Sequence, residues 1–215
     1  MAWLFKNKKK QILAPLEGYD QWAPFYALES NPIKSLSDKA IEKMLPNLGG
    51  KRFLDAGCGP GKFCVLAEKQ NASKIFGIDL SPKMIDLART NCRSGSFQCA
   101  DLSSIEIQSN SFDVIITALV FGHLKSLSPA LDNLLRALAH DGILIITDFH
   151  PFLTLMQSKR TFKNHIGQEF EIQHYLHLFE DYFKGFVIHQ LIVEDWQEPV
   201  YNEIPVVFAV RLRKM

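Results

Sequence analysis

The segment that most constrains the fold runs from residue 53 to residue 63 and reads Phe-Leu-Asp-Ala-Gly-Cys-Gly-Pro-Gly-Lys-Phe. An apolar run ends in Asp55, and glycines follow at alternate positions, Gly57, Gly59 and Gly61. Glycine adopts backbone conformations that other residues avoid and lets a ligand approach the main chain. Between a strand and a helix, such a turn delivers a ligand to the unpaired N–H groups of the helix N-terminus. The segment therefore predicts a nucleotide-like cofactor.

Two common phosphate-binding motifs compete for this segment. A P-loop requires a serine or threonine after its Gly-Lys pair, but Gly61-Lys62 is followed by Phe63. A dinucleotide-binding motif requires Gly-x-Gly-x-x-Gly/Ala. Gly57 and Gly59 fit that spacing, but Lys62 stands where the third glycine belongs. The P-loop interpretation fails, and the dinucleotide interpretation is weak.

A second acidic residue closes the next apolar run. The run from residue 75 to residue 78 leads into Asp79, and Ser81-Pro82 then supplies an N-cap and a favoured first helical residue. The glycine segment and Asp79 together resemble motif I and the following acidic position of the class I S-adenosylmethionine-dependent methyltransferases. Enzymes of quinone biosynthesis and the malonyl carrier-protein methyltransferases share these motifs. The resemblance implies S-adenosyl-L-methionine as cofactor and methyl transfer to an oxygen or nitrogen of a small molecule by in-line displacement.

The resemblance also assigns residues to the cofactor, most of them at or just after strand ends. They are Tyr19, Asp55, Gly57, Cys58, Gly59, Gly61, Asp79, Leu80, Met84, Asp101, Leu102 and Ala118. Asp55 and the glycine backbone would hold the methionine end, Asp79 the ribose hydroxyls, and Asp101 the adenine amine. Met84 is equally well explained as a helix core residue, and Asp101 could instead cap a turn.

Alternating strands and helices from residue 51 onward predict an α/β fold. Strands are expected at 52–56, 74–78, 95–99, 112–117 and 142–148, and helices at 61–70, 82–92 and 128–139. Two apolar runs, 186–193 and 205–212, indicate an antiparallel hairpin. With the resemblance, the expectation is a three-layer Rossmann-like sandwich around a mostly parallel seven-stranded sheet with an antiparallel C-terminal hairpin.

The domain organisation follows from length and composition. A chain of 215 residues that is 47% apolar can bury one substantial core, so we expect a single domain over 1–215. Residues 1–50 precede the first expected strand and form an N-terminal helical lid segment, with a helix expected from Ser37 to Leu45. Residues 149–177 follow the fifth strand as an inserted substrate cap, because an excursion of this length is usually functional.

Charge and cysteine content limit partners and compartment. The net charge of +1 gives no reason to expect nucleic acid as a partner, and no apolar run is long enough for a membrane span. A basic cluster, Lys6 to Lys10, is best explained as a solvated terminus. The four cysteines, Cys58, Cys64, Cys92 and Cys99, form no Cys-x-x-Cys pair, which favours reduced thiols and a cytoplasmic protein.

Three histidines are candidates for catalysis. An oxygen or nitrogen nucleophile can require a base with a pKa near working pH, which histidine meets most easily. His123 follows the fourth expected strand, His150 follows the fifth, and His174 lies near the end of the insert. Each is, taken alone, more often structural than catalytic. No metal site is expected, because His174 and His177 lack a third ligand at a recognisable spacing.

The acceptor itself is the least defined part of the prediction. Lys159, Arg160 and Lys163 in the insert could receive a carboxylate or phosphate, so an anionic or carrier-protein-linked substrate is a candidate, although a solvated loop explains them too. Enzymes that methylate nucleic-acid bases carry Asn/Asp-Pro-Pro-aromatic after the fourth strand, where this chain reads Thr-Ala-Leu-Val at 117–120. Two alternatives stay open: a catalytically silent cofactor-binding partner subunit and an NAD-dependent oxidoreductase.

Overall fold

The computed structural model describes residues 11–26, 29, 31–164 and 166–215. The basic cluster Lys6 to Lys10, and with it the start of the expected lid segment, lies outside the described residues.

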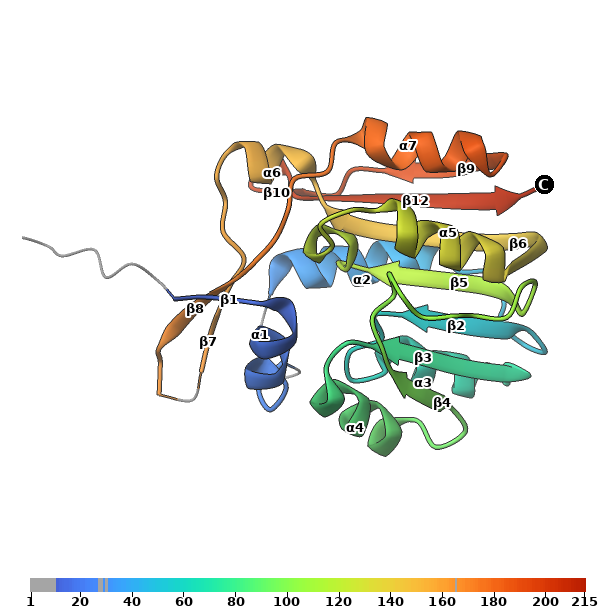
Figure 1. Ribbon diagram of the computed structural model, residues 1–215, viewed down its shortest axis with the longest axis horizontal. Helices are drawn as coiled ribbons and strands as arrows, with labels where there is room; N and C mark the ends of the chain where they lie inside the picture. The colour runs from blue at the N-terminus through green and yellow to red at the C-terminus, as the bar shows by residue number, and fades with distance from the viewer. Residues whose placement is uncertain (1–10, 27–28, 30, 165) are drawn as a thin grey trace, which may run out of the picture.

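A seven-stranded sheet forms the centre of the molecule (Figure 1). From one edge to the other its strands are β4 (Ser96–Cys99), β3 (Lys74–Asp79), β2 (Arg52–Ala56), β5 (Phe112–Ala118), β6 (Leu138–Phe149), β12 (Val207–Lys214) and β9 (Leu191–Gln197). Neighbouring strands from β4 to β6 are parallel, whereas β12 is antiparallel to both β6 and β9. This arrangement confirms the expected fold class, including the antiparallel C-terminal pair.

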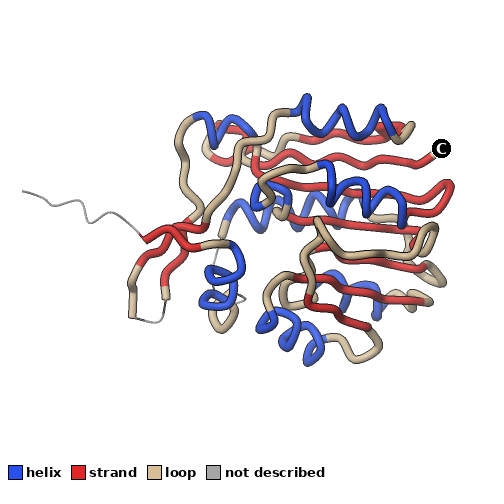
Figure 2. Tube along the Cα trace, in the orientation of Figure 1, coloured by secondary structure: helices blue, strands red, loops and turns tan. Residues whose placement is uncertain are grey.

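Helices cover both faces of the sheet (Figure 2). One layer contains α2 (Pro32–Met44), α3 (Lys62–Lys69) and α4 (Pro82–Asn91), and the other contains α5 (Ser128–Ala137) and α7 (Phe179–Ile188). Side chains of a strand alternate between the two faces: Phe53 packs in the core beneath α2 to α4, and its neighbour Leu54 packs in the core beneath α5 and α7. The two cores make the three layers of the sandwich.

The helix before the first parallel strand begins earlier than predicted. The Asn31 side chain accepts hydrogen bonds from the N–H groups of Ile33 and Lys34, at 2.9 and 3.2 Å, so that Asn31 is the N-cap and Pro32 the first residue of α2. An Asn-Pro pair that resembles a turn is thus a helix start signal. The helix expected from Ser37 to Leu45 corresponds to the later part of α2.

Two other boundaries differ from the prediction. The apolar run 186–193 is divided between the end of α7 and the start of β9, with Gln190 at a φ of 54° in the turn between them. Strand β6 begins at Leu138, directly after α5, rather than near residue 142. In both places one apolar stretch serves two elements, because helix and strand each bury apolar side chains against the same sheet.

The N-terminal segment and the insert form one unit, which we call the joint cap. A small sheet orders β1 (Gln11–Leu13), β8 (Glu169–Ile172) and β7 (Thr161–Lys163), with β1 parallel to β8 and β7 antiparallel to it. Helices α1 (Pro15–Trp22) and α6 (Pro151–Leu155) complete the unit. Trp22 stacks on Phe162 at 5.3 Å between ring centroids. The joint cap lies beyond one end of the sheet, at the left of Figure 1.

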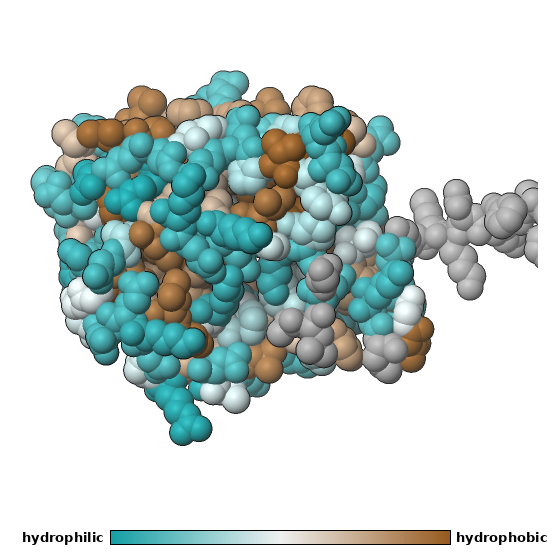
Figure 3. All heavy atoms as spheres, turned by 180° about the vertical axis from the view of Figure 1, so that it is seen from behind, coloured by the Kyte–Doolittle hydropathy of each residue, from teal (hydrophilic) through white to brown (hydrophobic). Residues whose placement is uncertain are grey.

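The edge of the sheet formed by β9 carries exposed apolar side chains. Val187 and Ile188 of α7 are 75% and 74% exposed, and Ile192 and Val193 on edge strand β9 are also exposed. Figure 3 shows apolar residues at the upper edge of the molecule seen from behind, where α7 lies. Among the described residues, no helix is both long and apolar enough to cross a membrane.

Candidate active site

A cavity of about 470 Å³ opens at the carboxyl ends of the parallel strands, where open α/β sheets bind ligands. We call it the strand-end cavity. Its walls come from the glycine segment, the ends of β3 and β5, the loop after β4 and the joint cap. They include Tyr19, Tyr26, Gly57, Gly59, Asp79, Leu80, Met84, Asp101, Leu102, Ala118, Leu119, His123 and Tyr175. Most residues that the resemblance assigns to the cofactor therefore meet at one cavity.

Asp79 is held rigidly at the wall of this cavity. One carboxylate oxygen accepts a hydrogen bond from the Gly59 N–H at 2.8 Å, and the other accepts one from the Ser81 N–H at 2.9 Å. The Ser81 hydroxyl donates to Asp20 of α1, so the joint cap is fastened to the same loop. Burial raises the pKa of Asp79. A buried carboxylate with free lone pairs at a cavity wall suits a ligand with two adjacent hydroxyls.

Each of the three glycines of the motif is needed for a different structural reason. Gly57 has a φ of 85°, and a Cβ there would lie 2.2 Å from a methyl group of Val120. Gly59 has a φ of 51°, and a Cβ there would meet only a ring atom of Tyr26, at 4.0 Å, so it would project into the space a ligand needs. Gly61 lines neither this cavity nor the one behind it, and instead lets α3 approach Ala88 of α4. The cradle fits a ligand that touches the main chain.

Asp55 borders a second cavity of about 630 Å³ on the other side of the glycine segment, which we call the loop cavity. The cavity is also lined by Lys34 and Cys58, and it shares Gly57, Gly59, Ala118 and Tyr26 with the strand-end cavity. Burial, followed by the charges of Asp79 and Asp38, raises the pKa of Asp55 to about 8. A buried carboxyl group of this kind favours a cationic ligand group, because a positive charge restores its ionised form.

The residues assigned to the adenine side line the strand-end cavity but also serve the fold. Met84 is 1% exposed and Leu102 is 5% exposed, so both are core residues as well as wall residues. The Asp101 carboxylate accepts a hydrogen bond from the Ser103 N–H at 2.8 Å, so one of its oxygens caps a turn. The structure thus shows the core role of Met84 and the turn-capping role of Asp101, and it places both residues at the wall of the cavity.

His123 is fixed as a neutral hydrogen-bond acceptor. Its Nδ1 lies 2.9 Å from the Gln173 carbonyl, to which it donates. Its Nε2 therefore accepts from the Tyr19 hydroxyl at 2.8 Å and from Arg160 at 3.0 Å. Burial, and next the charge of Arg160, lowers the pKa of His123 to about 3. The ring joins the strand-end cavity to the joint cap, and its one lone pair is already in use.

The other two histidines lie away from the strand-end cavity. His150 is the N-cap of α6, where its Nδ1 accepts from the Phe152 N–H at 3.2 Å, and burial lowers its pKa. His174 borders a surface depression together with Lys159 and Glu171, and burial lowers its pKa too. A catalytic role for either would require the joint cap to move.

A buried network behind His123 could not be found from the sequence. Asp148 accepts hydrogen bonds from the Gly122 N–H at 2.6 Å, from Arg160 at 3.1 Å and from the Tyr182 hydroxyl at 3.2 Å. A Cβ on Gly122 would lie 2.3 Å from the Arg160 guanidinium. The residues are far apart in the chain, and the one local signal in the sequence is Asp148, a charged residue near the end of the largely apolar run 143–149.

These contacts predict how turnover depends on pH. Because the pKa of His123 lies near 3, the ring does not change its charge between pH 5 and pH 8. We therefore expect the turnover rates of wild type and His123→Gln to depend on pH in the same way over this range. We also expect His123→Ala to lower turnover, because Tyr19 and Arg160 lose the acceptor that positions them, while the dissociation constant of S-adenosylhomocysteine stays within about threefold of wild type. A wild-type inflection near pH 6.5 that disappears in the glutamine variant would show instead that His123 acts as a base.

Comparison with known proteins agrees with this geometry. The family described as "Methyltransferase domain" matches residues 54–146. An uncharacterized protein of Haemophilus influenzae is 33% identical over 70% of this chain and 65% of its own length. A Bacillus cereus protein named malonyl-[acyl-carrier protein] O-methyltransferase is 33% identical over 75% of this chain and 63% of its own length. The chain thus spans slightly less than two thirds of each of these relatives.

Solved structures agree on the fold. A putative S-adenosylmethionine-dependent methyltransferase of Listeria monocytogenes superposes with a TM-score of 0.72, at 19% identity, over 84% of this chain and 99% of its own. Together these matches support a class I S-adenosylmethionine-dependent methyltransferase. The cofactor of that family is the one that the glycine segment and Asp79 predict, and these matches do not favour the nicotinamide alternative.

Proposed function

We propose that the protein is an enzyme that transfers the methyl group of S-adenosylmethionine to a small-molecule acceptor held beneath the joint cap. The observation that supports it most is the strand-end cavity, which brings Asp79, the glycine segment and Tyr19 of the joint cap around one space. The glycines and Asp79 are intact and Asp79 is oriented by two hydrogen bonds, which weakens the alternative of a silent partner subunit.

The residues of the chain would act mainly by positioning. When bound, the cofactor supplies an activated methyl group on a sulfonium, because the leaving group after transfer is a neutral thioether. Asp79 would hold the ribose, the glycine backbone and Asp55 the methionine end, and Leu80 and Met84 the adenine. Tyr19 and Tyr26 would close the space from the side of the joint cap and exclude water. Alignment of two bound reactants can by itself supply roughly 7–11 kcal/mol of the barrier.

Calorimetric titration with S-adenosylhomocysteine and with NAD tests the cofactor, and transfer of a labelled methyl group to a panel of small acceptors tests turnover. We expect saturable binding of S-adenosylhomocysteine and none of NAD. The reverse pattern, with NAD alone binding, would refute the proposal.

A carrier-protein-linked acceptor is a second candidate. Support comes from the name of the Bacillus cereus relative and from Lys159 and Lys163, which lie on the surface of the joint cap. If an acidic carrier protein docks there, Lys163→Glu should raise the KM for a carrier-linked substrate and leave the KM for the corresponding pantetheine thioester unchanged. We also infer a cytosolic location, which the free thiols of all four cysteines support.

A further inference from the structure

A small chamber lies next to the strand-end cavity, between the joint cap and the ends of β5 and β6. It has a volume of about 110 Å³, and we call it the cap chamber. Its lining residues are Tyr19, Trp22, Tyr26, Asn31, Ile33, Lys34, Leu119, Phe149, Lys159, Arg160, Thr161 and Ile172. Three of them, Tyr19, Tyr26 and Leu119, also line the strand-end cavity, so the two spaces share a wall.

The shared wall is conformationally strained. Leu119 follows the last residue of β5 with a φ of 58°, a region that residues with a Cβ rarely adopt. Its N–H donates to the Thr147 carbonyl at 2.8 Å, which holds it in place. Strain of this kind concentrates at ligand sites, where the surrounding structure enforces it. The surrounding structure therefore holds Leu119 in one defined conformation between the two spaces.

The charged residues that line the cap chamber are all cationic. Lys34, Lys159 and Arg160 line it, and its described lining includes no aspartate or glutamate. Lys159 forms an ion pair with Glu171 at 3.0 Å, and Arg160 forms one with Asp148 at 3.1 Å. Among the ion pairs of the described part of the chain, none includes Lys34.

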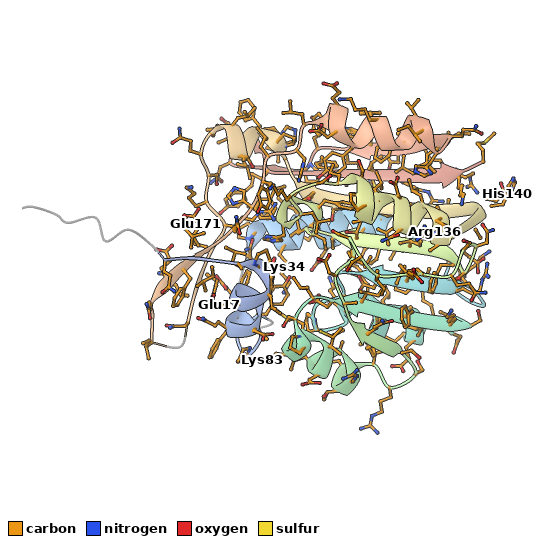
Figure 4. All side chains as sticks on the ribbon, viewed as in Figure 1. Glu17, Lys34, Lys83, Arg136, His140 and Glu171 are labelled. Atoms are coloured by element: carbon orange, nitrogen blue, oxygen red, sulfur yellow. The ribbon has the colours of Figure 1, made fainter. Side chains whose placement is uncertain are left out.

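Lys34 is an ammonium group in an unfavourable place. It lies in the first turn of α2, where the helix dipole disfavours a positive charge. Its Nζ donates to the Tyr26 carbonyl at 3.1 Å and lies 3.9 Å from the centre of the Tyr26 ring. Burial lowers its pKa, while the charges of Asp38 and Glu29 act in the opposite direction. Figure 4 shows Lys34 between the joint cap and the ends of the strands, with Glu17 and Glu171 on the side of the joint cap.

Arg160 is a second cationic residue in the lining of the same chamber. The residue is 8% exposed, and its guanidinium lies 3.5 Å from the centre of the Phe149 ring. Its two terminal nitrogens bind His123 and Asp148, but its Nε is buried without a hydrogen-bond partner. A buried N–H of a charged group without an acceptor is costly.

The size of the chamber limits its ligand. A volume of about 110 Å³ corresponds to the space of roughly four water molecules. A carboxylate with one or two methylene groups fits, whereas a nucleoside does not. We propose that the cap chamber binds a carboxylate group of the methyl acceptor, with Lys34 and Arg160 as its counterions. The proposal rests on the proposed function and names the substrate class for the same site.

Propionate and its uncharged isostere propionamide are suitable probes for the full-length protein saturated with S-adenosylhomocysteine. Ligand-observed NMR titration should show propionate binding at least about tenfold more tightly than propionamide. Lys34→Met should weaken propionate binding roughly 10- to 100-fold, the range for a hydrogen bond to a charged group. Lys39→Met is the matched control, because Lys39 is exposed on the same helix as Lys34 and lies outside the chamber, and it should leave the affinity unchanged.

Arg160→Lys supplies a second variant that keeps a positive charge beside the buried Asp148, so the network keeps its charge balance. It should also weaken propionate binding, because lysine cannot serve Asp148 and the ligand together. Equal affinity for propionate and propionamide, or equal propionate affinity in wild type and Lys34→Met, would overturn the proposal.

A comparison of cofactor analogues distinguishes carboxylate binding in the cap chamber from a role of Lys34 in cofactor binding and from failure of the proposed function. If Lys34 instead holds the cofactor's own carboxylate from the loop cavity, Lys34→Met weakens S-adenosylhomocysteine but not 5′-methylthioadenosine, and its role in the cap chamber is refuted. If S-adenosylhomocysteine does not bind wild type at all, the proposed function fails. If it binds normally and carboxylates do not, only the cap chamber proposal fails.

Discussion

Replacing Asp79 with alanine should weaken the binding of S-adenosylhomocysteine by at least roughly 100-fold. By family resemblance the carboxylate accepts from both ribose hydroxyls, and each hydrogen bond to a charged group contributes about 1.5–3 kcal/mol. The Gly59 and Ser81 N–H groups already orient the carboxylate. Little conformational entropy is therefore lost when the ligand binds, and most of the interaction energy contributes to affinity.

The design of this experiment must separate lost contacts from a disturbed loop. Asp79→Asn keeps an oxygen for one N–H group and loses the charge, so it should lie between wild type and alanine. Asp86→Ala is a matched control, because Asp86 is an exposed carboxylate on α4 that pairs only with Arg89. Affinity in Asp79→Ala within about threefold of wild type, with an unchanged melting temperature, would remove Asp79 from the cofactor site.

The site could be predicted from the sequence where its signals are local. Asp55, the glycines and Asp79 lie on strand–loop–helix units whose periodicity and caps are continuous in the chain, and parallel strands bring their ends to one edge. The seven-stranded, mostly parallel sheet and its antiparallel C-terminal pair followed from the resemblance, and the structure confirms them. The order of the strands was not predicted.

The features that could not be predicted from the sequence depend on contacts between residues that are far apart in the chain. Strand β1 has three residues and exists only because it pairs with β8, more than 150 positions later. The hydrogen bonds that fix His123 come from α1 and from the insert. A histidine after a strand predicts a base equally well whether its ring is solvated or buried, and only the fold decides its pKa. The cap chamber is likewise lined by residues from the N-terminal segment, the insert and the ends of two strands, which are far apart in the chain.

The second large effect concerns the stability of the unliganded protein. The pKa of Asp55 rises from 3.8 to about 8 on folding, so the native state binds more protons than the unfolded state between these values. The free energy of unfolding must then fall as pH rises through that window, by about 1.4 kcal/mol per pH unit at most. His123 has the opposite sign below pH 6.5, because its pKa falls from 6.5 to about 3 on folding.

Below pH 6.5 the contributions of Asp55 and His123 to the pH dependence of stability oppose each other. Above pH 6.5 the contribution of Asp55 dominates. Between pH 6.5 and pH 8 we expect wild type to lose about 2 kcal/mol of unfolding free energy, measured by urea denaturation. Asp55→Asn removes the titrating group with little change in shape, so its stability should stay nearly flat there. Parallel slopes in wild type and variant would mean that the carboxyl group is already ionised in the native state.

Cofactor binding should reverse this behaviour at Asp55. If the ammonium group of the methionine end approaches the carboxyl group, it favours the ionised form and lowers the pKa. Binding of S-adenosylhomocysteine at pH 7 should then release up to about one proton, which calorimetry in two buffers of different ionisation enthalpy measures. Asp55→Asn should release none. If wild type releases no proton, the cofactor does not change the pKa of Asp55, and Asp55 would then be a residue of the core alone.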